Sequence, residues 1–280
     1  MKRKTKKRLG CAALNIVFIL LCFVTLIPIL YAVSVSFSGA GAALSGNFSF
    51  IPADPTLENY RAILFDEPFM LWLKNSLLLS AGTVAVAMLC GVTAAYACSR
   101  WRFRGRRSLL MALLVLNAFP QVLSLFAYYR ILRLGGLLNS HAGLILIYAG
   151  SMCVFAIWNM KGYFDTIPVD IEEAARIDGA TDVQVVTRIV MPLAKPSVIV
   201  TALMVLIYVW NEYIYATTFM TGEANYTLAA GLYALQATEM SGSWPVFAAA
   251  SIVVSLPVLI IFFLCQKHMT SGLTAGGVKG

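Results

Sequence analysis

Long runs without a charged side chain dominate this sequence of 280 residues. A helix needs roughly 20 apolar residues to cross the hydrocarbon layer of a bilayer, and each run is long enough to supply them. A sixth stretch, Ser197 to Met220, is interrupted only by Glu212. The uninterrupted runs lie between Arg8 and Asp54, Lys74 and Arg100, Arg107 and Arg130, Arg133 and Lys161, and Glu239 and Lys267. The sequence therefore predicts an all-α integral membrane protein with six transmembrane helices.

The composition excludes an ordinary soluble domain. Hydrophobic residues make up 60% of the chain, charged residues 12%, and the mean hydropathy is +0.80. Soluble domains carry about twice that share of charge. The net charge of +8 would suit nucleic acid, but the basic residues occur where a membrane topology places them, so no nucleic-acid partner is expected.

The positions of Lys and Arg predict the orientation. If both termini are cytoplasmic, 17 basic residues fall inside and four outside. The four outer residues are Arg61, Lys74, Arg130 and Arg133. An excess of Lys and Arg in cytoplasmic loops is the normal bias of membrane proteins, and the opposite orientation would reverse it. We expect a multi-pass membrane protein with both termini in the cytoplasm.

The first apolar run is interpreted as an uncleaved anchor. It follows a basic N-terminus, as a secretory signal peptide would, and the small residues from Gly39 to Ala43 resemble a cleavage site. However, the apolar part of a signal peptide spans about 7–15 residues. Leu9 to Phe37 is long enough for a full membrane span.

Metal and cofactor chemistry are not expected. The six cysteines lie in or beside apolar runs with no pair at metal-ligand or redox spacing. His141 and His268 are on opposite predicted sides of the membrane. No Gly-rich phosphate loop is present, so the chain has no nucleotide site of its own. We predict that it is not an enzyme.

The expected organisation is one domain over residues 1–280. No internal repeat or low-complexity linker divides the chain. A stripe of small residues, Ala87, Gly91 and Ala95, is predicted to let another helix approach closely. Pro120 and Pro257 fall inside the third and sixth expected helices, where each is expected to kink its helix. The expected helices span residues 10–37, 72–99, 108–131, 140–163, 197–220 and 244–266, with a polar cytoplasmic segment at 165–192 and a cytoplasmic tail at 267–280.

The polar segment is predicted to form two short helices joined by a glycine turn. Asp170 and Glu173 have the spacing of a capping box, and Gly179 suits the left-handed residue that ends a helix. Thr181 and Gln184 repeat the capping pattern, and Pro192 is expected to end the second helix. On periodicity alone, an ordinary amphipathic cytoplasmic loop is the favoured interpretation.

The same segment resembles the cytoplasmic coupling loop of binding-protein-dependent ABC importer permeases. The family pattern is Glu-Ala-Ala, three residues, Gly, nine residues, then Ile, any residue, Leu and Pro. Met191 replaces the Leu, and the matching residues are Glu173, Ala174, Ala175, Gly179, Ile189 and Pro192. The resemblance implies a type I ABC importer permease fold, in which this loop docks in a groove of the ATPase subunit.

The resemblance also implies site residues. Glu173 is expected to pair with a basic ATPase residue, and Gly179 to permit close backbone approach. The expected ATPase-coupling residues are Glu172, Glu173, Ala174, Ala175, Asp178, Gly179, Ile189 and Pro192. The end of the chain is similar to the tail of the smaller permease of maltose-type importers, which reaches into the ATPase dimer. Its expected contact residues are Gly272, Leu273, Thr274, Ala275, Gly276, Gly277, Val278, Lys279 and Gly280, although the sequence alone indicates only a frayed terminus.

An acidic residue lies within the expected fifth span. A carboxylate at that depth is costly and is by default a functional hypothesis. Trp210 and Tyr213 have aromatic faces that suit sugar rings, and Asn211 and Glu212 can bind hydroxyl groups. Two interpretations stay open: this group lines a substrate path, or it forms a hydrogen bond with the partner permease.

The resemblance implies a permease subunit of a sugar importer in a bacterial or archaeal cytoplasmic (inner) membrane, with maltose-like sugars as the first expectation. The implied partners are a second, non-identical permease, two ATPase subunits, an extracytoplasmic sugar-binding protein and membrane lipid. A non-sugar solute is an alternative. An ion-coupled secondary transporter would need buried acids, of which only Glu212 qualifies, and a membrane enzyme would need a catalytic constellation that is not apparent.

Overall fold

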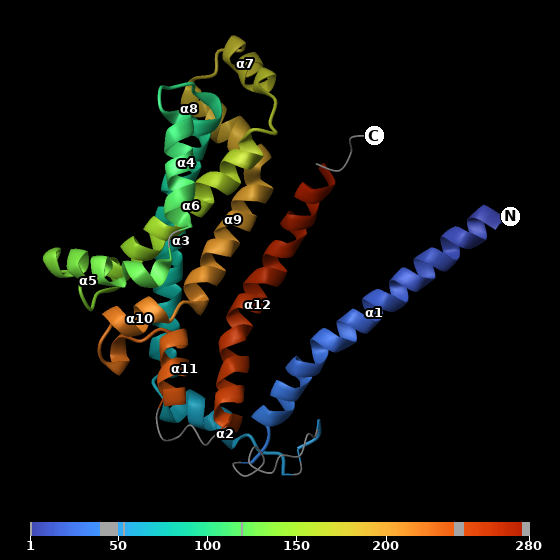
Figure 1. The fold of residues 1–280 in the computed structure, drawn as a ribbon, viewed down its shortest axis with the longest axis vertical. Coiled ribbons are helices and arrows are strands. Elements are labelled where there is room, and N and C mark those ends of the chain that lie inside the picture. Colours follow the sequence, from blue (N-terminus) through green and yellow to red (C-terminus); the bar gives the residue numbers. More distant parts are fainter. Residues whose placement is uncertain (1, 40–49, 53, 119, 238–243, 276–280) are drawn as a thin grey trace. The chain divides into compact units, whose positions relative to one another are not determined.

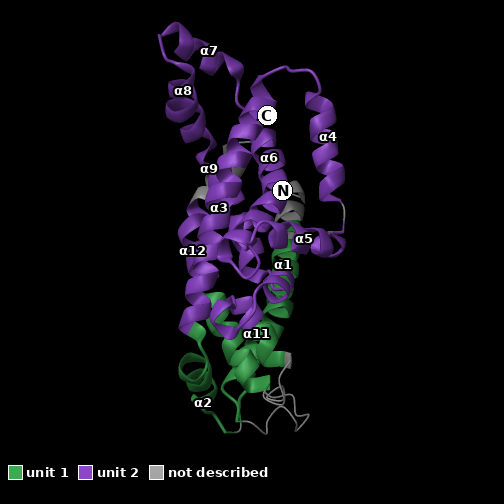
Figure 2. Cartoon of the chain, turned by 90° about the vertical axis from the view of Figure 1, so that its left-hand side faces the viewer, with its two compact units in different colours: residues 1–69, 232–256 green, residues 70–231, 257–280 purple. Residues whose placement is uncertain are grey.

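A computed structural model of the chain describes residues 2–39, 50–52, 54–118, 120–237 and 244–275. These residues divide into two compact units (Figures 1 and 2). The first unit comprises the described parts of residues 1–69 and 232–256, and the second those of residues 70–231 and 257–280. The expectation of a single domain stays a prediction.

The first unit contains the N-terminal helix α1, Lys2–Ser36, which begins within the basic terminus. A short α2, Glu58–Arg61, continues into a π-helical turn, Ala62–Asp66. Asn59 connects these elements, since its side-chain amide donates to the carbonyl oxygens of Ser36 and Ser38 at 2.9 and 2.8 Å. The unit also includes the end of α11, Leu228–Ala237, and the first part of α12, Trp244–Ala275.

The second unit contains the remaining helices. The long elements are α3, Phe69–Arg100; α4, Arg106–Asn117; α5, Leu125–Leu134; α6, His141–Phe164; and α9, Met191–Asn211. The short ones are the 3₁₀ turn Gln121–Ser124; α7, Val169–Ile177; α8, Asp182–Gln184; the π-helix Val185–Val190; α10, Ile214–Phe219; and the 3₁₀ turn Glu223–Asn225. Along α9, the short helices α7 and α8 lie at one end and α10 at the other (Figure 1).

Five helices in the described part of the chain are long and apolar enough to cross a membrane, and a bent pair would make a sixth span. The span candidates are Gly10–Ser36, Phe69–Arg100, His141–Phe164, Asp182–Asn211 and Trp244–Lys267. Four of the six expected spans therefore appear as continuous helical segments, and the fifth expected span does so as far as Asn211.

The expected third span, residues 108–131, is not one helix. Helices Arg106–Asn117 and Val122–Leu134 meet at 93°. Pro120 lies at the bend with extended backbone, φ −60° and ψ 118°. Proline has no N–H and disfavours helical conformation in the residue before it. The expected kink is therefore confirmed in place, but it is a sharp break.

The expected fifth span, residues 197–220, differs at both ends. The helix is continuous from Asp182 to Asn211, so Pro192 does not end a helix as predicted. A π-helical turn, Val185–Val190, lies immediately before it, and such a turn already departs from the regular hydrogen-bond ladder that proline interrupts. At the other end, the backbone leaves the helix at Glu212 and α10 begins at Ile214.

The small-residue stripe of α3 packs against α6. Ala87 and Ala95 are fully buried. A Cβ atom added to Gly91 would lie 2.5 Å from the Cβ of Ala156. The prediction of a close helix contact along this stripe is confirmed, and only glycine fits at its centre.

Candidate functional site

The polar segment forms a helix, a glycine turn and a second helix, as predicted. At the end of α7, the N–H of Ala180 donates to the carbonyl of Ala175, and the N–H of Gly179 to that of Arg176, both at 3.0 Å. These are the two bonds of a Schellman motif. Gly179 has φ +89°, so its predicted left-handed conformation is confirmed. We call residues 165–192 the coupling hairpin.

The two helix starts have different caps. Thr181 and Gln184 form the predicted capping box, with Thr181 N–H donating to the Gln184 side chain at 2.9 Å. The predicted box of Asp170 and Glu173 is absent. The first helix begins earlier, at Val169, with Pro168 as its N-cap and no side-chain hydrogen bond to the cap. Asp170 lies instead in the first turn, where a negative charge complements the helix dipole.

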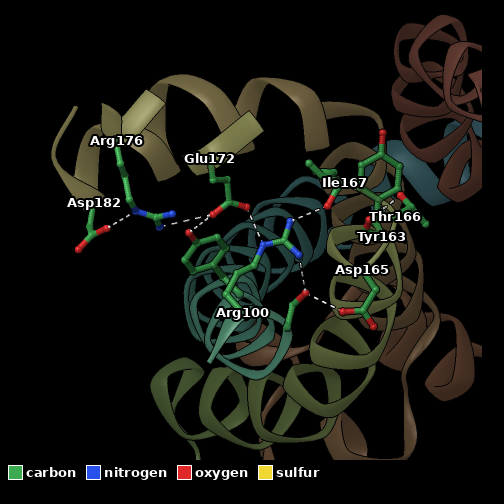
Figure 3. Close-up of polar contacts among 10 residues, drawn as sticks. Arg100, Tyr163, Asp165, Thr166, Ile167, Glu172, Arg176 and Asp182 are labelled. Carbon is green, nitrogen blue, oxygen red and sulfur yellow. Dashed lines mark hydrogen bonds and ion pairs between the residues drawn. The ribbon is translucent and has the colours of Figure 1, made fainter. Parts of the chain in front are cut away.

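Glu172 points away from solvent and toward α3 (Figure 3). Its side chain is 1% exposed, and one carboxylate oxygen accepts from the Arg100 Nε at 2.6 Å. The other accepts from the Tyr96 hydroxyl at 2.7 Å. Arg100 also donates to the carbonyl of Ile167 at 3.0 Å. A buried carboxylate requires such partners, so this network fastens α7 to the end of α3.

Two further ion pairs flank the network (Figure 3). Arg176 donates to Asp182 at 3.0 Å across the glycine turn, and this bond raises the pKa of Arg176. Asp165 accepts from Ser99 and Lys161, both at 2.6 Å. Burial opposes ionisation of Asp165, yet these bonds hold its pKa below the usual value. The hairpin is thus tied to α3 and to α6, and across its own turn.

The predicted coupling residues separate into two groups. Glu173, Ala174, Asp178, Gly179 and Pro192 are exposed. Glu172 and Ala175 are buried, and Ile189 is half-buried. Ala175 and Ile189 belong to an apolar cluster that includes Tyr96, Phe164 and Val190. Only the first group is therefore available to a docking protein.

Glu212 lies where the fifth span breaks. One oxygen accepts from the Tyr215 backbone N–H at 2.9 Å, and the other from the Tyr148 hydroxyl at 2.5 Å. The carboxylate therefore caps the start of α10 and contacts α6. Of its predicted companions, Trp210 is buried, while Asn211 and Tyr213 are exposed. The Asn211 side chain donates to the Ile207 carbonyl at 2.8 Å.

The predicted tail is only partly described. Helix α12, the sixth expected span, extends beyond the expected end at residue 266, and its last residues are Gly272, Leu273, Thr274 and Ala275. Gly276, Gly277, Val278, Lys279 and Gly280 lie outside the described residues. Among the described residues, no three His, Cys, Asp or Glu side chains gather where they could hold a metal ion.

The coupling hairpin and the helix break at Glu212 both lie within the part of the chain that matches a known family. The model of the inner membrane component of binding-protein-dependent transport systems matches residues 87–273, well over half of the chain. This protein belongs to that family.

Its relatives match over nearly their whole length. The permease is 36% identical over 269 residues to the galactooligosaccharide transport permease GanQ of Bacillus subtilis, with 94% of each chain covered. It is 34% identical over 282 residues to the maltodextrin transport permease MdxG of the same organism, with full coverage of both. A chain of the bacterial ABC transporter involved in alginate import superposes with a TM-score of 0.77 and 27% identity, covering 93% of the permease and 96% of that chain.

These findings confirm the predicted type I ABC importer permease fold and the inner-membrane location. The permease is the membrane component of a binding-protein-dependent transport system, and the ATPase of such a system is a separate subunit. Sequence reasoning missed Tyr96, Arg100 and Tyr148 as partners of the two carboxylates. One signal was present for Tyr148, because an acid within a membrane span, Glu212, requires a donor from another helix. Nothing in the sequence marked Glu172 as a buried acid.

Proposed function

We propose that this permease is the smaller membrane subunit of a sugar importer that works with a second permease, two ATPase subunits and an extracytoplasmic sugar-binding protein. The coupling hairpin is the main support for this proposal, because its motif, glycine turn and exposed acid suit a partner that docks from the cytoplasmic side. Relatives named for galactooligosaccharide, maltodextrin and maltose transport support oligosaccharides as the substrate class.

The exposed group of the hairpin forms the docking face. Glu173 supplies a negative charge and Ala174 leaves space beside it. Gly179, with no atom within 4 Å of a hypothetical Cβ, leaves an open backbone surface. We propose that this face enters the groove of an ATPase subunit, with Glu173 opposite a basic residue. Salt bridges that lose water in such an interface carry specificity for the partner.

The buried group transmits the movement. Glu172 connects α7 to Arg100 at the end of the second span. The π-helix Val185–Val190 packs against α7 and continues into α9. A displacement of the docking face therefore reaches two membrane spans through one salt bridge and one continuous helix. The chain converts closure of the ATPases into movement of the transport path.

A charge reversal tests the docking face. Glu173→Lys is expected to leave insertion intact, because the residue is exposed and makes no contact that positions α7. Co-purification with the ATPase and sugar uptake by reconstituted vesicles should both fall at least tenfold. Glu223→Lys reverses an exposed acid far from the hairpin and serves as the matched control. Wild-type uptake and ATPase association in Glu173→Lys would overturn the docking assignment.

The substrate class has its own test. The assembled transporter, reconstituted with its binding protein, should show ATP hydrolysis stimulated by oligosaccharides such as maltodextrins or galactooligosaccharides. Stimulation by an amino acid or phosphate, and by none of the sugars, would keep the importer assignment and overturn the sugar assignment.

A further inference from the structure

The turn between α3 and α4 connects two apolar helices over a very short distance. The second span candidate, Phe69–Arg100, ends at Arg100, and the next helix begins at Arg106. Gly105, with φ +87°, makes the reversal possible. A turn this short between two membrane helices must lie at the level of the lipid headgroups. On the orientation proposed above, it faces the cytoplasmic leaflet.

This turn is rich in arginine and contains no acid. We define the arginine turn as residues 100–107, with Arg100, Arg102, Arg104, Arg106 and Arg107. Trp101 and Phe103 between them are 63% and 42% exposed. Exposed aromatic rings beside basic residues are typical of the membrane interface, where the rings meet the acyl boundary and the cations meet the headgroups.

Two pockets open on the arginine turn. One, of about 540 Å³, is lined by Ser99, Trp101, Val169, Glu172 and four arginines, Arg100, Arg102, Arg106 and Arg176. The other, of about 530 Å³, is lined by Arg102, Phe103, Gly105, Arg106, Arg107, Ser108 and Leu110. Arg102 and Arg106 border both pockets, so an anion on either side meets them.

The nearby acids are already engaged. Glu172 is held by Tyr96 and Arg100, and Asp165 by Ser99 and Lys161. Among the described residues, Arg102, Arg104 and Arg107 form no salt bridge, and Arg106 donates to the carbonyl of Trp101 at 3.4 Å. Three of the five arginines of the turn, Arg102, Arg104 and Arg107, therefore present cationic groups without an internal counter-ion, whereas Arg100 is paired with Glu172.

We propose that the arginine turn binds the phosphate of an anionic lipid headgroup, such as phosphatidylglycerol, in these pockets. The planar guanidinium donates two parallel hydrogen bonds to phosphate, which a lysine ammonium does not. Basic clusters immediately cytoplasmic of a membrane helix attract anionic lipids. Because one pocket is also lined by Val169, Glu172 and Arg176 of α7, a bound headgroup contacts the coupling hairpin.

Lipid retention by the purified, assembled transporter tests the proposal. The complex is exposed to equal amounts of phosphatidylglycerol and phosphatidylcholine, and bound lipid is measured by native mass spectrometry. Wild-type protein should retain phosphatidylglycerol preferentially. The triple change Arg102→Gln, Arg106→Gln and Arg107→Gln, at arginines that line the pockets, should reduce this preference roughly tenfold or more, since each basic residue near the surface contributes to the attraction. The matched Lys triple variant should lose less, because it keeps the charge.

Every outcome bears on the proposal. Equal retention of the two lipids by the wild type would overturn it without any variant. Undiminished preference in a correctly inserted Gln variant would also overturn it, and would leave the arginines as determinants of topology alone. Loss of ATPase association with unchanged lipid preference would overturn it in favour of a protein docking surface. Displacement of the lipid by millimolar inorganic phosphate would show a site for free phosphate instead.

Discussion

At the scale of single residues, the two acids that stand out in the sequence both bind within the chain. Glu172 binds Tyr96 and Arg100, and Glu212 binds Tyr148 and the start of α10. Both side chains hold separate elements in place. The sequence identified Glu212 as unusual and gave Glu172 only as an expected ATPase-coupling residue. It did not reveal the partner of Glu172, because Arg100 lies 72 residues before Glu172 and pairing at that separation depends on the packing of the helices.

The effects on stability of substituting Glu172 and Arg100 should be strongly coupled, because the two side chains form a salt bridge. Glu172→Ala leaves a buried guanidinium unpaired, and is expected to destabilise the transporter by about 3–5 kcal/mol. Combining Glu172→Gln with Arg100→Met should be much less harmful than the sum of the single changes. Thermal unfolding of the purified complex measures this. Tyr96→Phe removes one hydrogen bond and should cost only about 1 kcal/mol. Additive effects of the two charge substitutions would contradict a direct pair.

Glu212 is predicted to act as a structural cap at the broken span. Glu212→Ala should destabilise the fold by about 1–3 kcal/mol, because the Tyr148 hydroxyl and the Tyr215 N–H lose their acceptor. Glu212→Gln keeps one acceptor oxygen and should retain part of the stability. Unfolding midpoints and uptake should therefore decline together along this series. Lost uptake with unchanged stability would instead favour a direct contact between Glu212 and the substrate.

At the scale of elements, turn chemistry was predictable and helix continuity was not. The spacing of Thr181, Gln184 and Gly179 acts over a few residues, so the sequence determines it locally. The prediction that Pro192 ends a helix was wrong, because the π-helix before it has no clear sequence signal. At Glu212 the opposite occurred: an apolar run predicted an unbroken helix, and a side-chain cap created a new helix start.

Gly179 gives an element-level prediction about backbone strain. Nothing lies within 4 Å of a hypothetical Cβ, so any penalty comes from the positive φ and not from a clash. Gly179→Ala is expected to cost about 1–2 kcal/mol, and Gly179→Asn less, because asparagine tolerates the left-handed region. Hydrogen exchange of the coupling hairpin should report this order. Equal protection in both variants would show that the turn can adopt another conformation.

The contact between α3 and α6 gives a second prediction. Gly91→Ala places a methyl group 2.5 Å from the Cβ of Ala156, and overpacking of this kind costs about 1–3 kcal/mol. Gly150→Ala, in the exposed part of α6, has nothing within 4 Å and should leave the unfolding midpoint unchanged or slightly higher. A lower midpoint for Gly150→Ala than for Gly91→Ala would exclude close packing along the stripe.

At the scale of the whole molecule, the apolar runs were sufficient to predict the fold class and most of the spans. Hydrocarbon thickness sets the length of a span, and that length can be read directly from sequence. The position of the bend at Pro120 was predicted from the sequence, but its angle of 93° was not. Its angle depends on how α4 and α5 pack, which no local pattern encodes.

The orientation of the chain in the membrane, with both termini cytoplasmic, can be tested by cysteine labelling. In a cysteine-free background, a single cysteine at position 104 should resist an impermeant thiol reagent added to intact cells, and one at position 225 should react. The excess of Lys and Arg on the cytoplasmic side gives the physical reason. Both should react after the membrane is permeabilised. Labelling at position 104 in intact cells would reverse the topology.

The unbroken helix from Asp182 to Asn211 has a mechanical consequence. At 1.5 Å per residue, 30 residues form a lever about 45 Å long. One end is fixed to the hairpin and the other ends at the Glu212 break. A tilt of about 10° would swing the far end by roughly 8 Å, enough to shift a neighbouring helix past a sugar ring. The π-turn Val185–Val190 within the hairpin would set the stiffness of this lever. Loosening it should therefore produce a transporter whose ATPase subunits hydrolyse ATP without movement of the sugar.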